Sequence, residues 1–200
     1  MKVGIFGGTF DPIHIGHLVV AEEARYKLGL DKVVFLPAGL PWFKNDRLIT
    51  DGRKRLEMIK LGIKDNPNFE VSDIELNRDG PTYSVESIPA LREQHGGAEL
   101  YFLLGMDALK DIYKWEQPGR IIEMCRVVGL TRPGHMDIDW AEIDSSIPGA
   151  SQKIQTIEVS RIEVSSSDIR MMVANDMSIR FLVPDAVISY IAKHGLYMHS

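Results

Sequence analysis

The stretch that decides the fold opens the chain and reads Val3-Gly4-Ile5-Phe6-Gly7-Gly8-Thr9-Phe10-Asp11-Pro12-Ile13-His14-Ile15-Gly16-His17. Its first residues, 3–6, form a short apolar run that ends at two glycines. A helix-period segment follows over 16–28, with its apolar residues on one stripe and Gly29 as a stop. A buried strand, a glycine turn and a helix in this order are typical of a parallel α/β sheet.

The rest of the chain repeats this alternation. We expect further strands over 33–36, 69–76, 100–104, 126–130 and 154–159. We expect further helices over 52–64, 84–93, 108–113, 118–124, 168–174 and 184–194, and a surface loop over 134–151. Apolar strands separated by helices predict an α/β fold with a doubly wound, mostly parallel sheet and helices on both faces. We expect one domain over 1–200, in which 160–200 form a small helical C-terminal part.

Composition narrows the classes of partner. The 200 residues include 23 basic and 28 acidic side chains, a net charge of −5. Proteins that bind long nucleic acids usually carry the opposite sign, so small polar ligands are the expected partners, with no nucleic acid. The single cysteine, Cys125, excludes a disulfide framework and a multi-cysteine zinc site. No apolar run approaches the roughly 18 residues that span a bilayer, so we expect a cytoplasmic protein with no membrane partner.

The turn after the first strand favours a phosphate ligand, although two other interpretations stay open. Gly7 and Gly8 carry no side chain to block a phosphate, and the following helix presents free N–H groups to an anion. His14 and His17 are three residues apart, so they share one face if the helix begins near residue 13. The alternatives are two ordinary surface histidines, or a metal site formed with Asp11. The spacing fits neither the G-x-G-x-x-G pattern nor a Walker A loop.

Residues 7–17 resemble the signature of the nucleotidyltransferase superfamily that shares an HxGH motif. Further stretches resemble one of its families, the bacterial nicotinate mononucleotide adenylyltransferases. In family order they are Arg55-x-x-Met58, Gly80-Pro81-Thr82-Tyr83-Ser84, Leu104-Gly105-Met106-Asp107, Trp115, Arg132-x-Gly134, Val164-Ser165-Ser166-Ser167-Asp168-Ile169-Arg170 and His194-Gly195-Leu196-Tyr197. A single HxGH is moderately specific, whereas this ordered set is highly specific and covers nearly the whole chain.

The resemblance implies a Rossmann-like nucleotidyltransferase fold and an activity in NAD biosynthesis. The family transfers the AMP moiety of ATP to nicotinate mononucleotide, giving nicotinate adenine dinucleotide (deamido-NAD) and pyrophosphate. The attacking phosphate is already anionic near neutral pH, so neither a strong base nor a covalent enzyme intermediate is needed. The reaction needs two anions held in line and cations near the leaving pyrophosphate. Mg²⁺ is expected with ATP, bound chiefly by triphosphate oxygens, with no protein ligand predicted.

The resemblance also assigns residues to the ATP half of the site. The expected catalytic residues are His14, His17, Lys44 and Arg170. The expected ATP-binding residues are Gly7, Gly8, Thr9, Phe10, His14, His17, Gly105, Asp107, Ser165, Ser166, Ser167 and Arg170. Judged by residue type alone, one serine of 165–167 would cap a helix while the others face water. The loop before Lys44 departs from the family pattern, because it carries Trp42-Phe43 where relatives often have a Pro-His pair.

The middle of the chain is expected to bind the acceptor. The resemblance implies a nicotinate mononucleotide site of Thr82, Tyr83, Ser84, Trp115 and Arg132. Each also has a structural alternative: a plain helix cap at Thr82 or Ser84, a core aromatic at Trp115, and a surface charge at Arg132. The nearest rival function is a phosphopantetheine adenylyltransferase, and a nucleotide sensor without turnover is a rival of another class. The choice between nicotinate and nicotinamide acceptors and the oligomeric state stay open.

Overall fold

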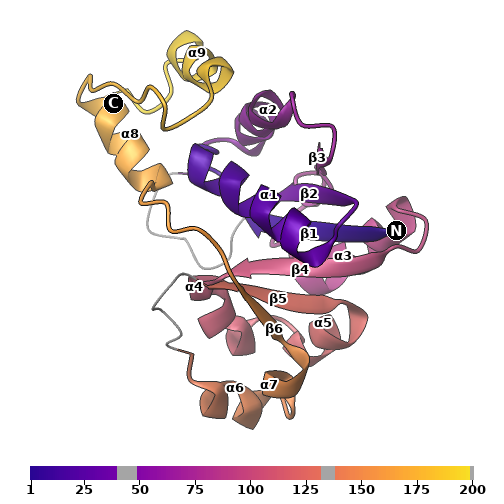
Figure 1. Cartoon of the computed structure of the whole chain (residues 1–200). Coiled ribbons are helices and arrows are strands. Elements are labelled where there is room, and N and C mark those ends of the chain that lie inside the picture. The colour runs from indigo at the N-terminus through magenta and orange to yellow at the C-terminus, as the bar shows by residue number, and fades with distance from the viewer. Residues whose placement is uncertain (40–48, 132–137, 199–200) are drawn as a thin grey trace.

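A computed structural model describes residues 1–39, 49–131 and 138–198, and its centre is a six-stranded sheet in the order β3-β2-β1-β4-β5-β6 (Figure 1). Every neighbouring pair of these strands is parallel. The strands are β1 (Lys2–Gly8), β2 (Lys32–Pro37), β3 (Phe69–Val71), β4 (Glu99–Gly105), β5 (Arg126–Thr131) and β6 (Gln155–Glu158). The predicted α/β doubly wound sheet is confirmed, and its described strands are all parallel.

Helices connect the strands and cover both faces of the sheet (Figure 1). They are α1 (Ile15–Leu28), α2 (Gly52–Ile63), α3 (Ser84–Gln94), α4 (Met106–Lys110), the 3₁₀ turn η1 (Ile112–Lys114), α5 (Pro118–Met124), α6 (Trp140–Ser146), α7 (Ala150–Lys153), α8 (Ser166–Ala174) and α9 (Asp185–Lys193). Asp51 caps α2, which begins where a helix over 52–64 was predicted. Its carboxylate accepts the backbone N–H of Arg53 at 3.0 Å. Among the described helices none is long and apolar enough to cross a membrane.

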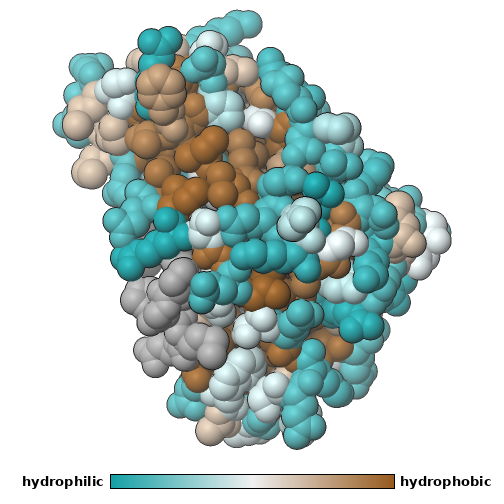
Figure 2. Space-filling model, in the orientation of Figure 1, coloured by the Kyte–Doolittle hydropathy of each residue, from teal (hydrophilic) through white to brown (hydrophobic). Residues whose placement is uncertain are grey.

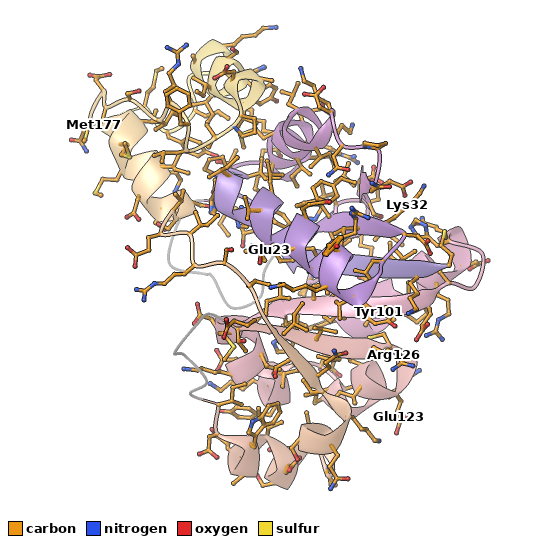
Figure 3. All side chains as sticks on the ribbon, in the orientation of Figure 1. Glu23, Lys32, Tyr101, Glu123, Arg126 and Met177 are labelled. Carbon is orange, nitrogen blue, oxygen red and sulfur yellow. The ribbon has the colours of Figure 1, made fainter. Side chains whose placement is uncertain are left out.

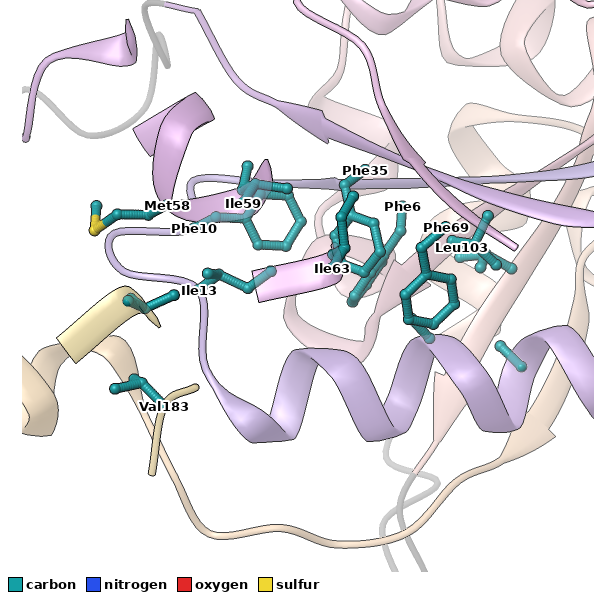
Figure 4. Close-up of a cluster of buried hydrophobic side chains, with 14 of the residues drawn as sticks. Phe6, Phe10, Ile13, Phe35, Met58, Ile59, Ile63, Phe69, Leu103 and Val183 are labelled. Atoms are coloured by element: carbon teal, nitrogen blue, oxygen red, sulfur yellow. The ribbon is translucent and has the colours of Figure 1, made fainter. Parts of the chain in front are cut away.

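Each central strand supplies two separate cores, because successive side chains point to opposite faces. Phe6 of β1 and Leu103 of β4 belong to a first core that also holds residues of α1, α2, α8 and α9 (Figure 4). Their neighbours Ile5 and Phe102 belong to a second core with residues of α3, α4, α5, α6 and α7. Burial on both faces explains why these strands read as continuous apolar runs.

The C-terminal part shares the first core with the sheet. Val183 belongs to the same buried cluster as Ile13, which follows the turn after β1 (Figure 4). Val187 and Ile191 of α9 are buried in the same cluster as Met58 of α2. Apolar residues gather on the surface where α8 and α9 lie beside α1 and α2 (Figure 2). We therefore propose that this part folds together with the sheet as one domain.

Strand order reverses between β1 and β4, at the centre of the sheet. From β1 the chain runs outward through β2 and β3, then returns to pair β4 with the other side of β1. Loops that leave the two strands therefore diverge, which opens a crevice at their carboxyl ends. Gly7 and Gly8 end β1, and Gly105 ends β4. The fold thus places the glycine turn where doubly wound sheets bind ligands.

The opposite edge of the sheet, where strands begin, is a solvated surface. Arg126 at the start of β5 pairs with Glu99 at the start of β4. Its guanidinium lies 5.8 Å from the centre of the Tyr101 ring, and the two side chains neighbour each other in Figure 3. All three positions lie at strand beginnings, far along the strands from Gly7 and Gly105. Exposed pairs of this kind contribute about 1 kcal/mol or less.

Three expected segments differ from the structure. The strand predicted over 69–76 ends at Val71, and a turn follows in which Leu76 donates its N–H to the Asp73 carbonyl at 2.9 Å. The loop predicted over 134–151 contains α6 and the start of α7, because Asp139 caps α6 and Ile143 anchors it in the second core. The helix predicted over 108–113 divides into α4 and η1.

Candidate active site

Arg55 binds the backbone of the loop that follows β1. It is buried, with 2% of its surface exposed. It donates to four backbone carbonyls, those of Thr9 at 2.8 Å, Ala38 at 2.8 Å, Gly39 at 3.4 Å and Thr50 at 2.9 Å. Burial lowers the pKa of its guanidinium, while the charge of Asp11 raises it. Arg55 therefore joins the loop after β1 to the loop after β2.

Asp11 is the buried anchor at the middle of the same loop. Its Oδ1 accepts the hydroxyl of Tyr197 at 2.7 Å, and its Oδ2 accepts the Thr50 N–H at 3.2 Å. Its backbone carbonyl accepts Nη1 of Arg170 at 2.6 Å. Both carboxylate oxygens are thus engaged by protein donors. Among the described residues no three His, Cys, Asp or Glu side chains are grouped to hold a metal ion, so the metal alternative for Asp11 with the two histidines finds no support.

The two histidines of the HxGH motif lie face to face at the start of α1. His14 is the residue before the helix, and its ring stacks on that of His17 with 3.7 Å between centroids. The backbone N–H of His14 donates to Nδ1 of His17 at 3.3 Å. Because Nδ1 is an acceptor, the neutral His17 ring carries its proton on Nε2. His17 is therefore a hydrogen-bond donor at Nε2.

Burial keeps both imidazoles neutral in the free protein. It lowers the pKa of His14 from 6.5 to about 4. The pKa of His17 is lowered well below 6.5, first by burial and then by the nearby His14. Nδ1 of His14 is a buried polar atom with no hydrogen-bond partner. Such an atom costs free energy unless a ligand or water reaches it, so the pair suits an anion that supplies acceptors and restores charge.

We expect the unliganded protein to lose stability as pH falls from about 6.5 toward about 4. The folded pKa of His14 lies below its unfolded value, so the unfolded chain binds more protons in this window and stability rises with pH. His14 alone accounts for about 3 kcal/mol, as an order of magnitude. Urea unfolding at several pH values measures the slope. The His14→Asn variant should show a shallower slope, and the exposed His194→Asn should match the parent. Equal slopes in His14→Asn and the parent would contradict this assignment.

Gly16 is the small residue that lets the histidines stack. A Cβ at this position would lie 3.1 Å from both Cε1 and Nδ1 of the His14 ring. The ring would have to move by a few tenths of an ångström, and its stacking with His17 would move with it. The central glycine of the motif therefore has a steric role.

The Gly16→Ala substitution should lower turnover about tenfold, because small displacements of catalytic groups are costly. The protein should still fold, since alanine is the better helix former. Steady-state kinetics together with thermal unfolding measure both effects. Gly119→Ala is the matched control, because a Cβ at that helical glycine meets only Ile147, at 4.0 Å. Full activity in Gly16→Ala would show that the ring has room to spare.

The serine cluster, residues 165–167, joins the start of α8 to the loop between β1 and α1, residues 9–14, which we call the front loop. Ser165 caps the helix, accepting the Asp168 N–H at 3.1 Å and donating to its Oδ2 at 2.7 Å. Ser166 donates to the carbonyl of Pro12 at 2.8 Å. Ser167 accepts Nη2 of Arg170 at 3.0 Å. One serine is the cap expected from the sequence, whereas Ser166 contacts the loop rather than water.

A cavity of about 630 Å³ lies at the carboxyl ends of β1, β2 and β4. Nine sequence-predicted residues line it: Gly7, Gly8, Thr9, Thr82, Tyr83, Ser84, Gly105, Asp107 and Trp115. Gly7 and Gly8 at the end of β1 therefore border the cavity together with Thr9. Thr9 begins the loop whose backbone Arg55 and α8 bind. Neither imidazole is among its described lining residues. The structure thus brings the two predicted halves of the site together at the end of β1.

The acceptor candidates occupy one wall of this cavity. Tyr83 is the N-cap residue of α3, and no side chain forms a capping hydrogen bond there. Because the cap position belongs to Tyr83, the plain-cap alternative for Thr82 or Ser84 is wrong. The backbone N–H groups in the first turn of α3 are therefore not taken by a side-chain cap, and they can donate to a ligand. Trp115 is half-buried, with its ring edge-to-face on Phe102 at 5.9 Å, while it also lines the cavity. Its core and cavity interpretations both hold.

Phe10 has a supporting position next to the histidines. Its side chain is 2% exposed, and its ring lies edge-on to that of His17 with 5.0 Å between centroids. It also packs against Phe6 and Phe35 in the first core (Figure 4). The Phe10 side chain therefore positions His17. Two predicted residues, Lys44 and Arg132, lie outside the described residues.

Glu75 is a residue of the cavity wall that sequence reasoning missed. It lines the cavity and is 6% exposed. Its carboxylate accepts the hydroxyls of Ser87 at 2.8 Å and Thr82 at 3.1 Å. Burial raises its pKa, while the hydrogen bonds from Ser87, Thr82 and Gly39 and the charge of Arg78 lower it. The buried carboxyl of Glu75 thus contacts Thr82, a residue predicted to bind the acceptor substrate.

The profile of the cytidylyltransferase-like family matches residues 5–172. A relative from Dehalococcoides mccartyi that bears the name "probable nicotinate-nucleotide adenylyltransferase" is 44% identical over 198 residues, which cover 98% of this chain and 97% of the relative. A relative of the same name from Thermomicrobium roseum is 44% identical over 98% of this chain and 91% of its own. Among solved structures, the nicotinic acid mononucleotide adenylyltransferase of Plasmodium falciparum complexed with NaAD superposes with a TM-score of 0.76 at 22% identity, over 98% and 97% of the two chains, which supports the fold.

Proposed function

Because the chain belongs to the cytidylyltransferase-like family and, within it, to the nicotinate-nucleotide adenylyltransferases, we propose how its residues divide the reaction. The activity is the transfer of the AMP moiety of ATP to nicotinate mononucleotide in NAD biosynthesis. The products are nicotinate adenine dinucleotide and pyrophosphate. One observation carries the assignment of residues: the end of β1 (Gly7 and Gly8) and Thr9 border the cavity, and Thr9 begins the loop that leads to the histidine pair. The two substrates would meet at this loop.

The ATP half is formed by the front loop, α1 and α8. His17 would donate from Nε2 to the α-phosphate, where charge changes most during transfer. His14 would donate to the neighbouring phosphates and so give its buried Nδ1 a partner. Phosphate charge would also raise the pKa of both rings and favour their protonated forms.

The phosphate chain beyond would be held from the C-terminal part. The start of α8 offers N–H groups and the 165–167 hydroxyls next to the front loop. Arg170 lies on the same turn and would contact the phosphates near the leaving pyrophosphate. Lys44, outside the described residues, keeps its sequence-based assignment to the same phosphates. Gly105 and Asp107 would contact the nucleotide from the end of β4.

The acceptor half is the cavity wall of α3 and Trp115. The free N-terminal turn of α3 would bind the pyridine carboxylate, and the Trp115 ring would stack on the pyridine. Arg132 would bind the acceptor phosphate, as the sequence suggests. This phosphate attacks the α-phosphorus directly and pyrophosphate leaves, so the chain's task is to hold the two in line.

Magnesium would arrive with ATP. The described residues group no three His, Cys, Asp or Glu side chains that could hold a metal ion. We therefore assign the ligands of the ion chiefly to the triphosphate oxygens. When bound, the ion spreads the charge that develops on the leaving pyrophosphate. We also propose a cytoplasmic location, because a chain with a single cysteine has no internal disulfides of the kind that proteins of oxidising compartments use.

A panel of acceptors tests this function. The protein is incubated with ATP, Mg²⁺ and either nicotinate mononucleotide, nicotinamide mononucleotide or phosphopantetheine, while pyrophosphate release and dinucleotide formation are followed. We expect fastest release with nicotinate mononucleotide, together with nicotinate adenine dinucleotide. Reaction with phosphopantetheine alone would identify a different adenylyltransferase. ATP binding without pyrophosphate release in every case would indicate a nucleotide sensor.

A further inference from the structure

Glu75 connects two walls of the acceptor cavity. Its carboxylate receives the hydroxyl of Thr82, just before α3, and that of Ser87, one turn inside α3. It also receives the backbone N–H of Gly39, which follows β2. A Cβ on Gly39 would lie 2.6 Å from the Glu75 carbonyl and 2.8 Å from Cγ2 of Thr82, so these segments are in close contact. The carboxyl group is therefore held in place by hydrogen bonds from Gly39, Thr82 and Ser87.

The protonation of this group decides what Thr82 can offer a ligand. When Glu75 is ionised, the Thr82 hydroxyl donates to it and presents only lone pairs elsewhere. When Glu75 is neutral, its own O–H can donate to the Thr82 oxygen, and the Thr82 proton becomes available to an acceptor in the cavity. An ionised Glu75 also repels an anion placed at the start of α3.

We propose that Glu75 is a specificity-determining residue, whose neutral form admits an acceptor with a carboxylate and whose ionised form disfavours it. This rests on the proposed function, which places the pyridine carboxylate at the start of α3. Binding of the anionic acceptor takes up one proton from solvent onto Glu75. A carboxamide acceptor carries no charge at that position, so its binding needs no such uptake.

Charged groups around Glu75 fit this role. Arg78 donates to the Ser87 hydroxyl at 3.1 Å and so acts on Glu75 through that hydroxyl. Asp107 of α4 and the nearby Asp111 and Glu116 also line the cavity. Lys114 lines it too, but it pairs with Asp111 at 2.6 Å. Burial therefore opposes ionisation of Glu75, and the charge of Arg78 favours it.

Proton uptake on binding tests the proposal. Calorimetry of nicotinate mononucleotide and nicotinamide mononucleotide in buffers of different ionisation enthalpy gives the protons taken up by each. The difference between the two ligands removes the titration of their shared phosphate. For the parent protein we expect this difference to approach one proton above the pKa of Glu75. The ratio of the two KM values should then rise by up to about tenfold per pH unit.

Two variants locate the proton. Glu75→Gln keeps the size and donates to Thr82 permanently, so the difference should vanish and the KM ratio should become independent of pH. Glu93→Gln removes one exposed charge from the last turn of the same helix and should behave as the parent. A parent difference of zero would overturn the proposal, even if Glu75→Gln failed to fold. Retained uptake in Glu75→Gln, or its loss in Glu93→Gln, would overturn it too. No dinucleotide from the parent at any pH would instead overturn the proposed function.

Discussion

Replacing His17 by alanine lowers kcat by about 10²–10⁴-fold, while the KM for ATP changes much less. The reason is geometric. The bond from the His14 N–H fixes Nδ1 of His17 as an acceptor, so Nε2 is a donor with a set direction. Stacking on His14 and the edge of Phe10 hold the ring in place before any ligand binds. A donor fixed in advance stabilises charge that develops only in the transition state.

Steady-state kinetics and direct ATP binding measure the two parts of this effect. His17→Asn should recover part of the loss, because an amide N–H can replace the ring donor. His194→Ala, at the exposed end of α9, is the matched control and should retain full turnover. Unchanged turnover in His17→Ala would remove this residue from the mechanism. An equal fall in ATP affinity and kcat would assign it to ground-state binding alone.

The Trp115→Ala variant should raise the KM for nicotinate mononucleotide by about 10–100-fold and leave the KM for ATP nearly unchanged. Loss of an aromatic stacking partner is worth on the order of 1–3 kcal/mol, which gives this range. Trp115 is half-buried on Phe102 and faces the cavity, so its removal changes the acceptor wall more than the sheet. Initial rates with each substrate varied in turn measure the two constants.

Trp140→Ala separates this effect from loss of packing. Trp140 of α6 is also half-buried against the second core, but it is not among the lining residues of the cavity. It should lower thermal stability about as much as Trp115→Ala and leave both KM values alone. If Trp115→Ala raises the KM values for both substrates equally, Trp115 is a core residue and the acceptor site lies elsewhere.

Much of the fold could be predicted because its signals are local. The apolar runs of β1, β2, β4 and β5 and the cap at Asp51 are each readable within a few residues. The segment after Val71 could not be read in this way. Its alternation continues past the strand, yet the chain turns there so that Glu75 can point inward to Thr82. An alternating pattern does not show where the last ladder hydrogen bond is formed.

The site was predictable where a motif carries it and not where distant residues meet. The spacing of His14 and His17 indicated that their rings lie together, although His14 precedes α1 and is not part of the helix. The contact of Asp11 with Tyr197 joins residues 186 positions apart, and no spacing rule reaches that far. The same holds for Arg55, which resembles a surface or ion-paired cation and instead binds carbonyls of two loops. Such contacts depend on how the sheet brings its loops together.

A crystal structure with a non-hydrolysable ATP analogue and nicotinate mononucleotide would show whether the two substrates meet at the loop after β1. We expect the α-phosphate within hydrogen-bond distance of Nε2 of His17, the outer phosphates toward α8, and the pyridine ring on Trp115. A triphosphate bound away from the front loop, with both imidazoles still facing only each other, would contradict it.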